Sequence, residues 1–298
     1  LNFASDIKFS PDGYWLAISA KTASNVNSSG YTNQGYVALY YRSTPIDYEL
    51  AQVIVSQNQD DNEFFGSKLS FAKTSANTFI LAVSAIGHNG LDGKVYFYKQ
   101  AIGNILWTTF VNPLTSGTND RYGYSISLST NGDIFAASAP NYDNNTGAVY
   151  FYKLNNGQYE FIDLLDRSLT DLYLNDEYQF GNSIDVSANG KLLAVGAPFA
   201  ITDSLNDGKV YVFSLETAPE LQQTITSIKT ENFEKFGFDV KFMKNDNSLV
   251  IFSANGDITQ KTIFDTPNYT TFDNSSLQIV DIKIDSGRID IFDRYNTN

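Results

Sequence analysis

His88 is the only histidine among the 298 residues, and the sequence contains no cysteine. Nucleophilic catalysis of the Ser-His-Asp kind would have to use His88, but no Gly-x-Ser-x-Gly nucleophile elbow accompanies it. Zinc and related metals take most of their ligands from Cys and His, so a lone histidine predicts no such site. We therefore expect His88 to be an exposed loop residue and the chain to form no disulfide.

Carboxylates recur along the chain shortly before a series of Phe-Gly or Tyr-Gly dipeptides, at Asp61, Asp120, Asp176 and Glu231. If these dipeptides open equivalent structural units, the four side chains lie around one rim. A ring of acidic groups raises the local concentration of cations and favours a basic partner. The alternative is that each carboxylate caps a turn beside the dipeptide.

Aromatic side chains that can stack on a sugar are a second kind of candidate. Tyr142, which precedes Asp143, and Phe199 lie in polar segments between apolar runs and are the better contact candidates. Trp15 and Trp107 fall within apolar runs, so we expect both to pack in the core.

Composition excludes several kinds of partner. Asp and Glu outnumber Lys and Arg by 33 to 20, which gives a formal charge of −13. We expect no nucleic-acid partner and no membrane insertion, and an anionic membrane is a poor partner, because binding phosphate needs a basic surface. The sequence has no apolar run of about 20 residues that could span a bilayer. It begins at Leu1 without an initiator Met, which indicates a removed leader or a segment of a larger protein.

The elements that must position these residues form an internal repeat. The glycine of the aromatic-Gly dipeptide recurs at Gly66, Gly123, Gly181 and Gly237, at steps of 57, 58 and 56 residues. Each copy contains four short alternating or apolar runs separated by Asn-, Asp- and Gly-rich turns, for example at 124–128, 134–138, 148–152 and 159–165. A period of this kind with four strands per copy is typical of a β-propeller.

The sequence therefore predicts an all-β fold, a β-propeller of four-stranded antiparallel blades within a single domain, 1–298. Five copies are recognisable, the first with Ala4 in place of the glycine, and a partial copy follows them. The predicted blades span about 3–61, 62–119, 120–177, 178–233 and 234–276, with the partial repeat at 277–294. Small residues in the second strand of each copy, such as Ala136-Ala137-Ser138-Ala139, indicate close packing between neighbouring blades.

At these residues the chain resembles the FG-GAP repeat of integrin α-subunit propellers and of many bacterial and viral surface proteins. The matching motifs are Phe-Gly at the start of a copy, Gly-Ala-Pro after the second strand, as in Gly196-Ala197-Pro198, and Gly-x-Val-Tyr at the third strand. The copies together cover nearly the whole chain. The resemblance implies a propeller that binds proteins or glycans at the cell exterior.

Many members of that family carry a calcium loop between the first two strands of a blade. Here the corresponding segments are Ser10–Gly13, Ala72–Asn77, Thr130–Asp133 and Ala188–Gly190. Calcium takes roughly six to eight oxygen ligands, several of them carboxylates, and these segments hold too few. We therefore expect no cofactor and interpret the segments as tight hairpin turns, in which Asn, Asp and Gly accept a positive φ.

Antiparallel connectivity places the loops between second and third strands at the same blade end as the segments that join blades. These segments are longer than the turns at the other end, so we expect recognition there, through Asp61, His88, Asp120, Tyr142, Asp143, Asp176, Phe199 and Glu231. The leading hypothesis is a non-enzymatic module that binds a protein or glycan on a cell or virion surface. A structural propeller in a virion appendage or extracellular filament, and a carbohydrate-active enzyme that uses channel carboxylates, are the alternatives. Sequons at Asn27, Asn144, Asn268 and Asn274 matter only in a eukaryotic secretory route.

Overall fold

The computed structural model describes residues 4–24, 30–58, 60–100, 103–111, 114–170, 178–201, 208–216, 218–227, 235–243, 249–253 and 288–292. Its contacts divide the chain into two compact units. Unit 1 comprises Leu1–Ala139 and Tyr152–Phe161, and unit 2 comprises Pro140–Phe151 and Ile162–Asn298. No helix among the described residues is long and apolar enough to cross a membrane.

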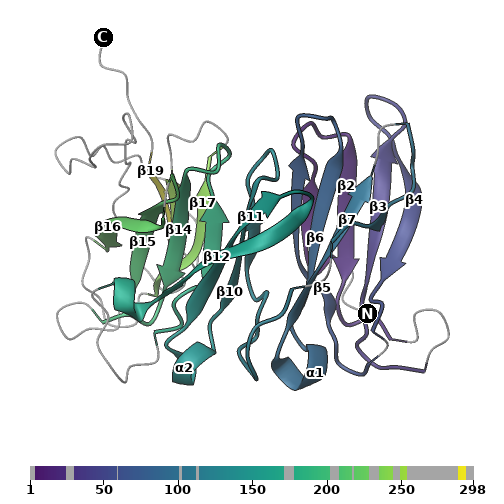
Figure 1. The fold of residues 1–298 in the computed structure, drawn as a ribbon. Helices are drawn as coiled ribbons and strands as arrows, with labels where there is room; N and C mark the ends of the chain where they lie inside the picture. The colour runs from purple at the N-terminus through teal and green to yellow at the C-terminus, as the bar shows by residue number, and fades with distance from the viewer. Residues whose placement is uncertain are drawn as a thin grey trace, which may run out of the picture. The chain divides into compact units, whose positions relative to one another are not determined.

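The fold is all β, with 52% of the described residues in strands (Figure 1). Sheet 1 consists of β1 (Ile7–Phe9), β2 (Trp15–Ala20), β3 (Tyr36–Arg42) and β4 (Tyr48–Val55). Sheet 2 consists of β5 (Phe65–Lys73), β6 (Phe79–Ala85), β7 (Lys94–Gln100) and β8 (Thr108–Thr109). Both are antiparallel sheets whose strands neighbour one another in sequence order, as predicted.

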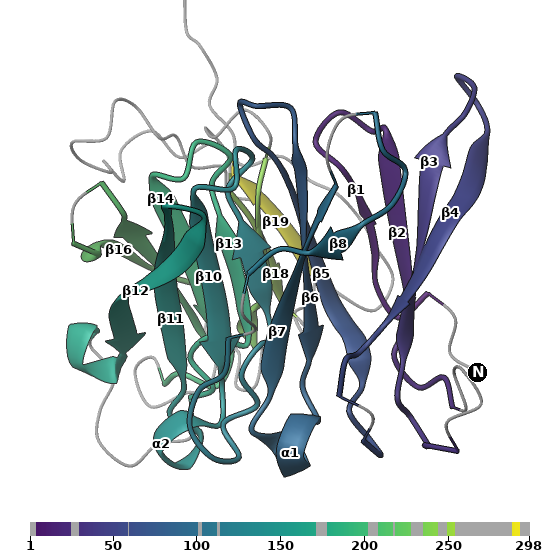
Figure 2. The ribbon, with the colours of Figure 1, turned by 45° about the vertical axis from the view of Figure 1, so that its right-hand side comes forward.

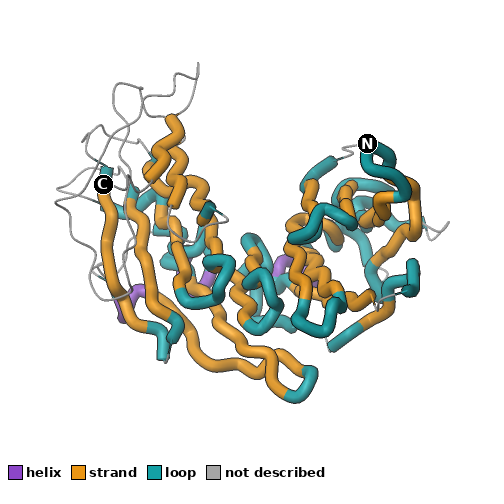
Figure 3. Tube along the Cα trace, turned by 90° about the horizontal axis from the view of Figure 1, so that it is seen from above, coloured by secondary structure: helices purple, strands orange, loops and turns teal. Residues whose placement is uncertain are grey.

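Sheet 3 includes strands of both units, and sheets 4 and 5 belong to unit 2. Sheet 3 consists of β9 (Ile126–Leu128), β10 (Ile134–Ala139), β11 (Ala148–Asn155) and β12 (Gln158–Asp166). Sheet 4 consists of β13 (Ser183–Val186), β14 (Leu192–Ala197), β15 (Lys209–Ser214) and β16 (Glu220–Thr226). Sheet 5 consists of β17 (Phe236–Phe242), β18 (Leu249–Ser253) and β19 (Arg288–Phe292). The tube in Figure 3 shows strands as the prevailing element. Helical structure in the described residues is limited to the turns α1 (His88–Leu91), α2 (Tyr142–Asn145) and η2 (Arg167–Leu169).

β19 lies in the predicted partial repeat, 277–294, but belongs to sheet 5. Residues 289–292 resemble the second strand of a further copy, but β19 pairs antiparallel with β18, with Ile251 opposite Asp290. These residues therefore form the third strand of sheet 5. Residues 254–287, between β18 and β19, lie outside the described residues.

The aromatic-Gly bends pack in the same way in four places. The aromatic residue is buried each time, and its backbone lies against the glycine that opens the third strand of the preceding sheet. A Cβ added to that glycine would stand 2.1 to 2.2 Å from the aromatic residue's carbonyl oxygen. The four pairs are Gly35 with Phe65, Gly93 with Tyr122, Gly147 with Phe180 and Gly208 with Phe236. The four aromatic residues therefore occupy equivalent buried positions.

The glycine of three bends packs on a small residue of the preceding sheet's second strand. A Cβ on Gly66 would lie 2.7 Å from the Cβ of Ser19, and a Cβ on Gly123 would lie 2.9 Å from that of Ser84. The small residues of the second strand therefore permit the close approach that the sequence indicated. Ala4 stands where the later copies have glycine and keeps a left-handed φ of 65°.

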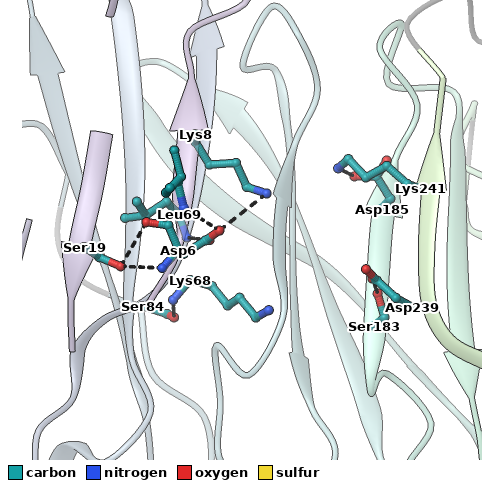
Figure 4. A network of polar contacts seen from close by, with 11 residues as sticks. Asp6, Lys8, Ser19, Lys68, Leu69, Ser84, Ser183, Asp185, Asp239 and Lys241 are labelled. Atoms are coloured by element: carbon teal, nitrogen blue, oxygen red, sulfur yellow. Dashed lines mark hydrogen bonds and ion pairs between the residues drawn. The ribbon is translucent and has the colours of Figure 1, made fainter. Parts of the chain in front are cut away.

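In three places a side chain in or directly before one first strand bonds to the backbone of the next first strand. In unit 1, Asp6 Oδ2 accepts from the Leu69 N–H at 2.8 Å, and Ser70 Oγ accepts from the Leu128 N–H at 3.0 Å. In unit 2, Asp185 Oδ2 accepts from the Phe242 N–H at 2.8 Å. Figure 4 shows Asp6 beside Leu69 and, in unit 2, Asp185 beside Lys241. These bonds satisfy backbone groups at the edge of each sheet.

The turns between first and second strands share one hydrogen-bond pattern in sheets 1 and 3. The side-chain oxygens of Asp12 and Asn131 each accept from the hydroxyl that opens the turn, Ser10 Oγ at 2.7 Å and Ser129 Oγ at 2.8 Å. The same oxygens accept a backbone N–H two residues further on. Gly132 follows with a φ of 78°. The interpretation of these segments as hairpin turns is confirmed.

Candidate functional site at the loop ends

We call the end of a sheet at which the second strand leads into the third its loop end. At two loop ends the connection is a short helical turn, α1 in unit 1 and α2 in unit 2 (Figure 2). Both turns contain left-handed residues, including Asn89 at φ 49° and Asn144 at φ 58°. Such residues cost free energy in the folded state and persist only where their surroundings hold them.

One position in this connection is equivalent in four sheets. Its carbonyl accepts the N–H of the glycine that opens the third strand, at 3.0 to 3.2 Å. The residues at this position are Ala23, His88, Tyr142 and Ala200. His88 and Tyr142 therefore stand where two other sheets have a buried alanine. Phe199 lies one residue earlier, so it is not equivalent to the other two candidates.

In unit 1, hydrogen bonds join the loop ends to the segments between sheets. Asp61 Oδ1 accepts from the Thr32 N–H at 2.7 Å and from Thr32 Oγ1 at 3.0 Å. Asp92 Oδ1 accepts from the Asn119 N–H at 2.9 Å. These bonds put each segment between sheets beside the preceding loop end, as the connectivity predicted.

Unit 2 braces its loop ends in a similar way. The Phe180 N–H donates to the Thr146 carbonyl at 3.0 Å. Asp143, which is exposed, forms an ion pair with Arg167 at 2.9 Å. Phe199 is half-buried, and the Lys235 ammonium lies 5.2 Å from the centre of its ring. A cation over the ring occupies the face that a sugar would stack on.

The structure corrects the alignment of the carboxylates. Phe64, Arg121 and Gln179 each directly precede the aromatic residue of a bend. Each donates its backbone N–H to a carbonyl of the preceding loop, so the three positions are equivalent. The residue before each of these is Glu63, Asp120 or Tyr178, and all three are buried. Asp120 is thus equivalent to Glu63 and not to Asp61.

The four predicted carboxylates accordingly do not form one equivalent set. Asp61 is exposed, and its bonds to Thr32 hold its pKa below the usual range. Asp120 is buried, and burial raises its pKa although Ser116 and the Gly117 backbone donate to it. Asp176 and Glu231 lie outside the described residues.

Glu63, which is 0% exposed, anchors a polar cluster that sequence reasoning missed. Its Oε1 accepts from Ser56 Oγ at 2.6 Å and from the Tyr96 hydroxyl at 2.7 Å. Its Oε2 has no hydrogen-bond partner among the described residues. His88 Nδ1 lies 3.6 Å from Oε1, and the Asn58 amide lies 3.3 Å from the same ring nitrogen. Counting two residues back from the aromatic of each bend would have identified Glu63.

His88 is not the exposed loop residue that the sequence predicted. Its side chain is 12% exposed because it packs over Glu63 and Asn58. Burial lowers the pKa of the imidazole, and the nearby Lys94 charge lowers it further. Burial raises the pKa of Glu63, since removing a carboxylate from water disfavours its charged form.

The tryptophans pack as predicted. Trp15 and Trp107 are both buried in unit 1, with their rings edge to face at a centroid distance of 5.2 Å. Phe71 completes this part of the core through an edge contact with Trp107. Neither tryptophan can serve as a sugar platform.

No group of three or more His, Asp or Glu side chains that could hold a metal ion occurs among the described residues. No protein-family model matches the sequence. The FG-GAP assignment therefore stays a prediction.

Proposed function

We propose that the chain is a β-propeller domain, of the FG-GAP type, that binds a protein or glycan partner through its loop ends without catalysing a reaction. The repeated sheets are its blades. Four equivalent contacts between an aromatic-Gly bend and the glycine of the preceding third strand support this architecture. Contacts that recur between neighbouring units are typical of repeat proteins.

The outer face of sheet 1 also supports a propeller. Ile7 and Phe9 of β1 are 48% and 56% exposed, whereas Leu69 and Phe71, at the same positions of β5, are 1% and 8% exposed because sheet 1 covers them. Leu50 and Val53 of β4 lie on the same open face. A further blade that covers this face would remove the apolar surface from water.

The observation that carries the binding proposal is that hydrogen bonds fix the loop ends to the neighbouring segments. Short exposed turns are held in left-handed conformations and tied by side-chain and backbone bonds to the neighbouring segment. A surface ordered before binding loses less entropy when a partner docks. The net charge of −13 favours a basic partner.

The absence of catalysis is supported by the arrangement around His88. Ser56 Oγ, which bonds to the same carboxyl group that faces His88, donates to Glu63 Oε1. A serine nucleophile needs a base that accepts its proton. We also propose that the protein lies on a cell or virion surface and uses no cofactor.

The test uses a glycan array and a basic-peptide array, with the intact chain as probe. Tyr142→Ala combined with Phe199→Ala should weaken any binding at least tenfold in unit 2, and Asp61→Asn should weaken binding at the unit 1 loop end. The matched control is Asn155→Ala, in an exposed turn at the opposite end of sheet 3. If the control abolishes binding and the loop-end variants do not, the proposed surface is wrong. Hydrolysis of an arrayed glycan would support the enzyme alternative instead.

A further inference from the structure

The contact between sheets 1 and 2 encloses a carboxyl group that is only half satisfied. Ser56, directly after β4, and Tyr96, on β7, both donate to Glu63 Oε1. Oε2 is buried and has no partner among the described residues. A buried carboxylate with one unpartnered oxygen is costly, because its desolvation is not offset on that side.

The described elements packed on this carboxyl group bring several titratable or charged groups near it. The turn α1 contributes His88, and Asp92 directly follows this turn. The segment after β4 contributes Asp60, and β7 contributes Lys94, Tyr96 and Tyr98. His88 is the one of these that lies within 4 Å of Glu63 and changes charge near neutral pH.

We propose that Glu63 and His88 hold a single proton between them, and that gain or loss of a proton weakens the contact between sheets 1 and 2. With one proton the pair has no net charge, either as a carboxylic acid beside a neutral imidazole or as a carboxylate beside an imidazolium. Adding a proton leaves a buried positive charge, and removing one leaves a buried negative charge. Two interacting groups of this kind titrate as a pair.

The separate pKa shifts have the signs that this pair requires. Burial raises the pKa of Glu63, so the stability it contributes is complete below the ordinary value of 4.5 and is lost as pH rises through the raised value. Burial lowers the pKa of His88, so its contribution is present above 6.5 and is lost as pH falls through the lowered value. The contact therefore weakens in both directions.

The repeat shows that the position tolerates a neutral side chain. Tyr178 lies two residues before Phe180, as Glu63 lies two residues before Phe65. Tyr178 is therefore equivalent to Glu63, and it is also buried. A neutral hydrogen-bonding group thus fits the same backbone. We expect Glu63→Gln to fold, since Gln keeps the shape and one acceptor oxygen of the carboxylic acid.

The experiment follows the imidazole of His88 by NMR as pH is varied. Because His88 is the only histidine, its ring resonances need no assignment. The wild-type chain should show two steps, a lower one as the pair gains a proton and a higher one as the pair loses its proton, because Glu63 Oε1 lies 3.6 Å from His88 Nδ1. Glu63→Gln should abolish the upper step and keep the lower one.

A stability series provides the second measurement. The wild-type urea midpoint should fall on both sides of its optimum, whereas Glu63→Gln should no longer lose stability on the alkaline side. The control is Glu220→Gln, an exposed carboxylate at the start of β16, which should follow the wild type. A single step near pH 6.5 that is the same in wild type and Glu63→Gln would overturn the proposal. The proposal does not depend on partner binding, so it can fail while the proposed function stands.

Discussion

Gly93→Ala tests the contact that repeats between the sheets. Gly93 directly precedes β7 and has a φ of 83°. An added Cβ would lie 2.2 Å from the carbonyl oxygen and 2.5 Å from the amide nitrogen of Tyr122. Both are backbone atoms, so the contact cannot be relieved by rotating a side chain. The two sheets must separate or the bend must distort.

The expected loss combines two costs. Placing alanine in the left-handed region costs about 1–2 kcal/mol. Overpacking against a fixed neighbour costs a further ~1–3 kcal/mol. Gly93→Ala should therefore destabilise the protein by about 2–5 kcal/mol. Gly90→Ala, in the same loop, meets nothing within 4 Å at a φ of 76° and should incur only the first cost.

Urea unfolding followed by tryptophan fluorescence suits this comparison, because Trp15 and Trp107 are both buried in unit 1. A stability loss appears as a lower midpoint at an unchanged slope. Gly93→Ala should lower the midpoint about two to three times as far as Gly90→Ala does. Equal midpoints for the two variants would refute the idea that close backbone approach joins the sheets.

Three further outcomes are expected. Phe180→Ala should destabilise by roughly 3–5 kcal/mol, because its buried ring packs against Tyr211 and Phe213; an unchanged denaturation midpoint would contradict this. Chelation of calcium should leave the melting temperature unchanged, since turn oxygens such as that of Asp12 are already hydrogen-bonded; a sharp fall would show a structural calcium site. Asp120→Asn should gain stability relative to wild type as pH rises from about 4 towards 7, because burial raises the pKa of Asp120; parallel pH profiles in denaturation would argue against that shift.

The strand order and the bends follow from the sequence because backbone geometry dictates their residues. Gly93 and Gly147 each precede a third strand at a place where a Cβ would meet the next sheet's backbone. Gly132 ends a turn that needs a positive φ. Such requirements recur in every copy, so they appear in the sequence as a period. The same logic places the buried Phe65 and Phe180.

Side-chain environments at the loop ends could not be predicted in the same way. The spacing between Asp61 and the Phe-Gly bend differs by two residues from that of Asp120, so a search for carboxylates pairs residues in different settings. Asp61 is exposed and Glu63 is buried, although both precede the same bend. The burial of His88 likewise depends on Glu63 and Asn58, which tertiary packing brings to it.

The position shared by Ala23, His88, Tyr142 and Ala200 shows where this fold has freedom to acquire function. Its backbone carbonyl has the same role in all four of these sheets, because it accepts the N–H of the next glycine. Its side chain is not required, since alanine serves in two sheets. A large polar or aromatic side chain at such a position is therefore not explained by the repeat itself. His88 has a partner in Glu63 that explains it. Tyr142 lies half-buried beside the exposed Asp143, which makes it the loop-end residue whose substitution tests recognition with the least disturbance of the fold.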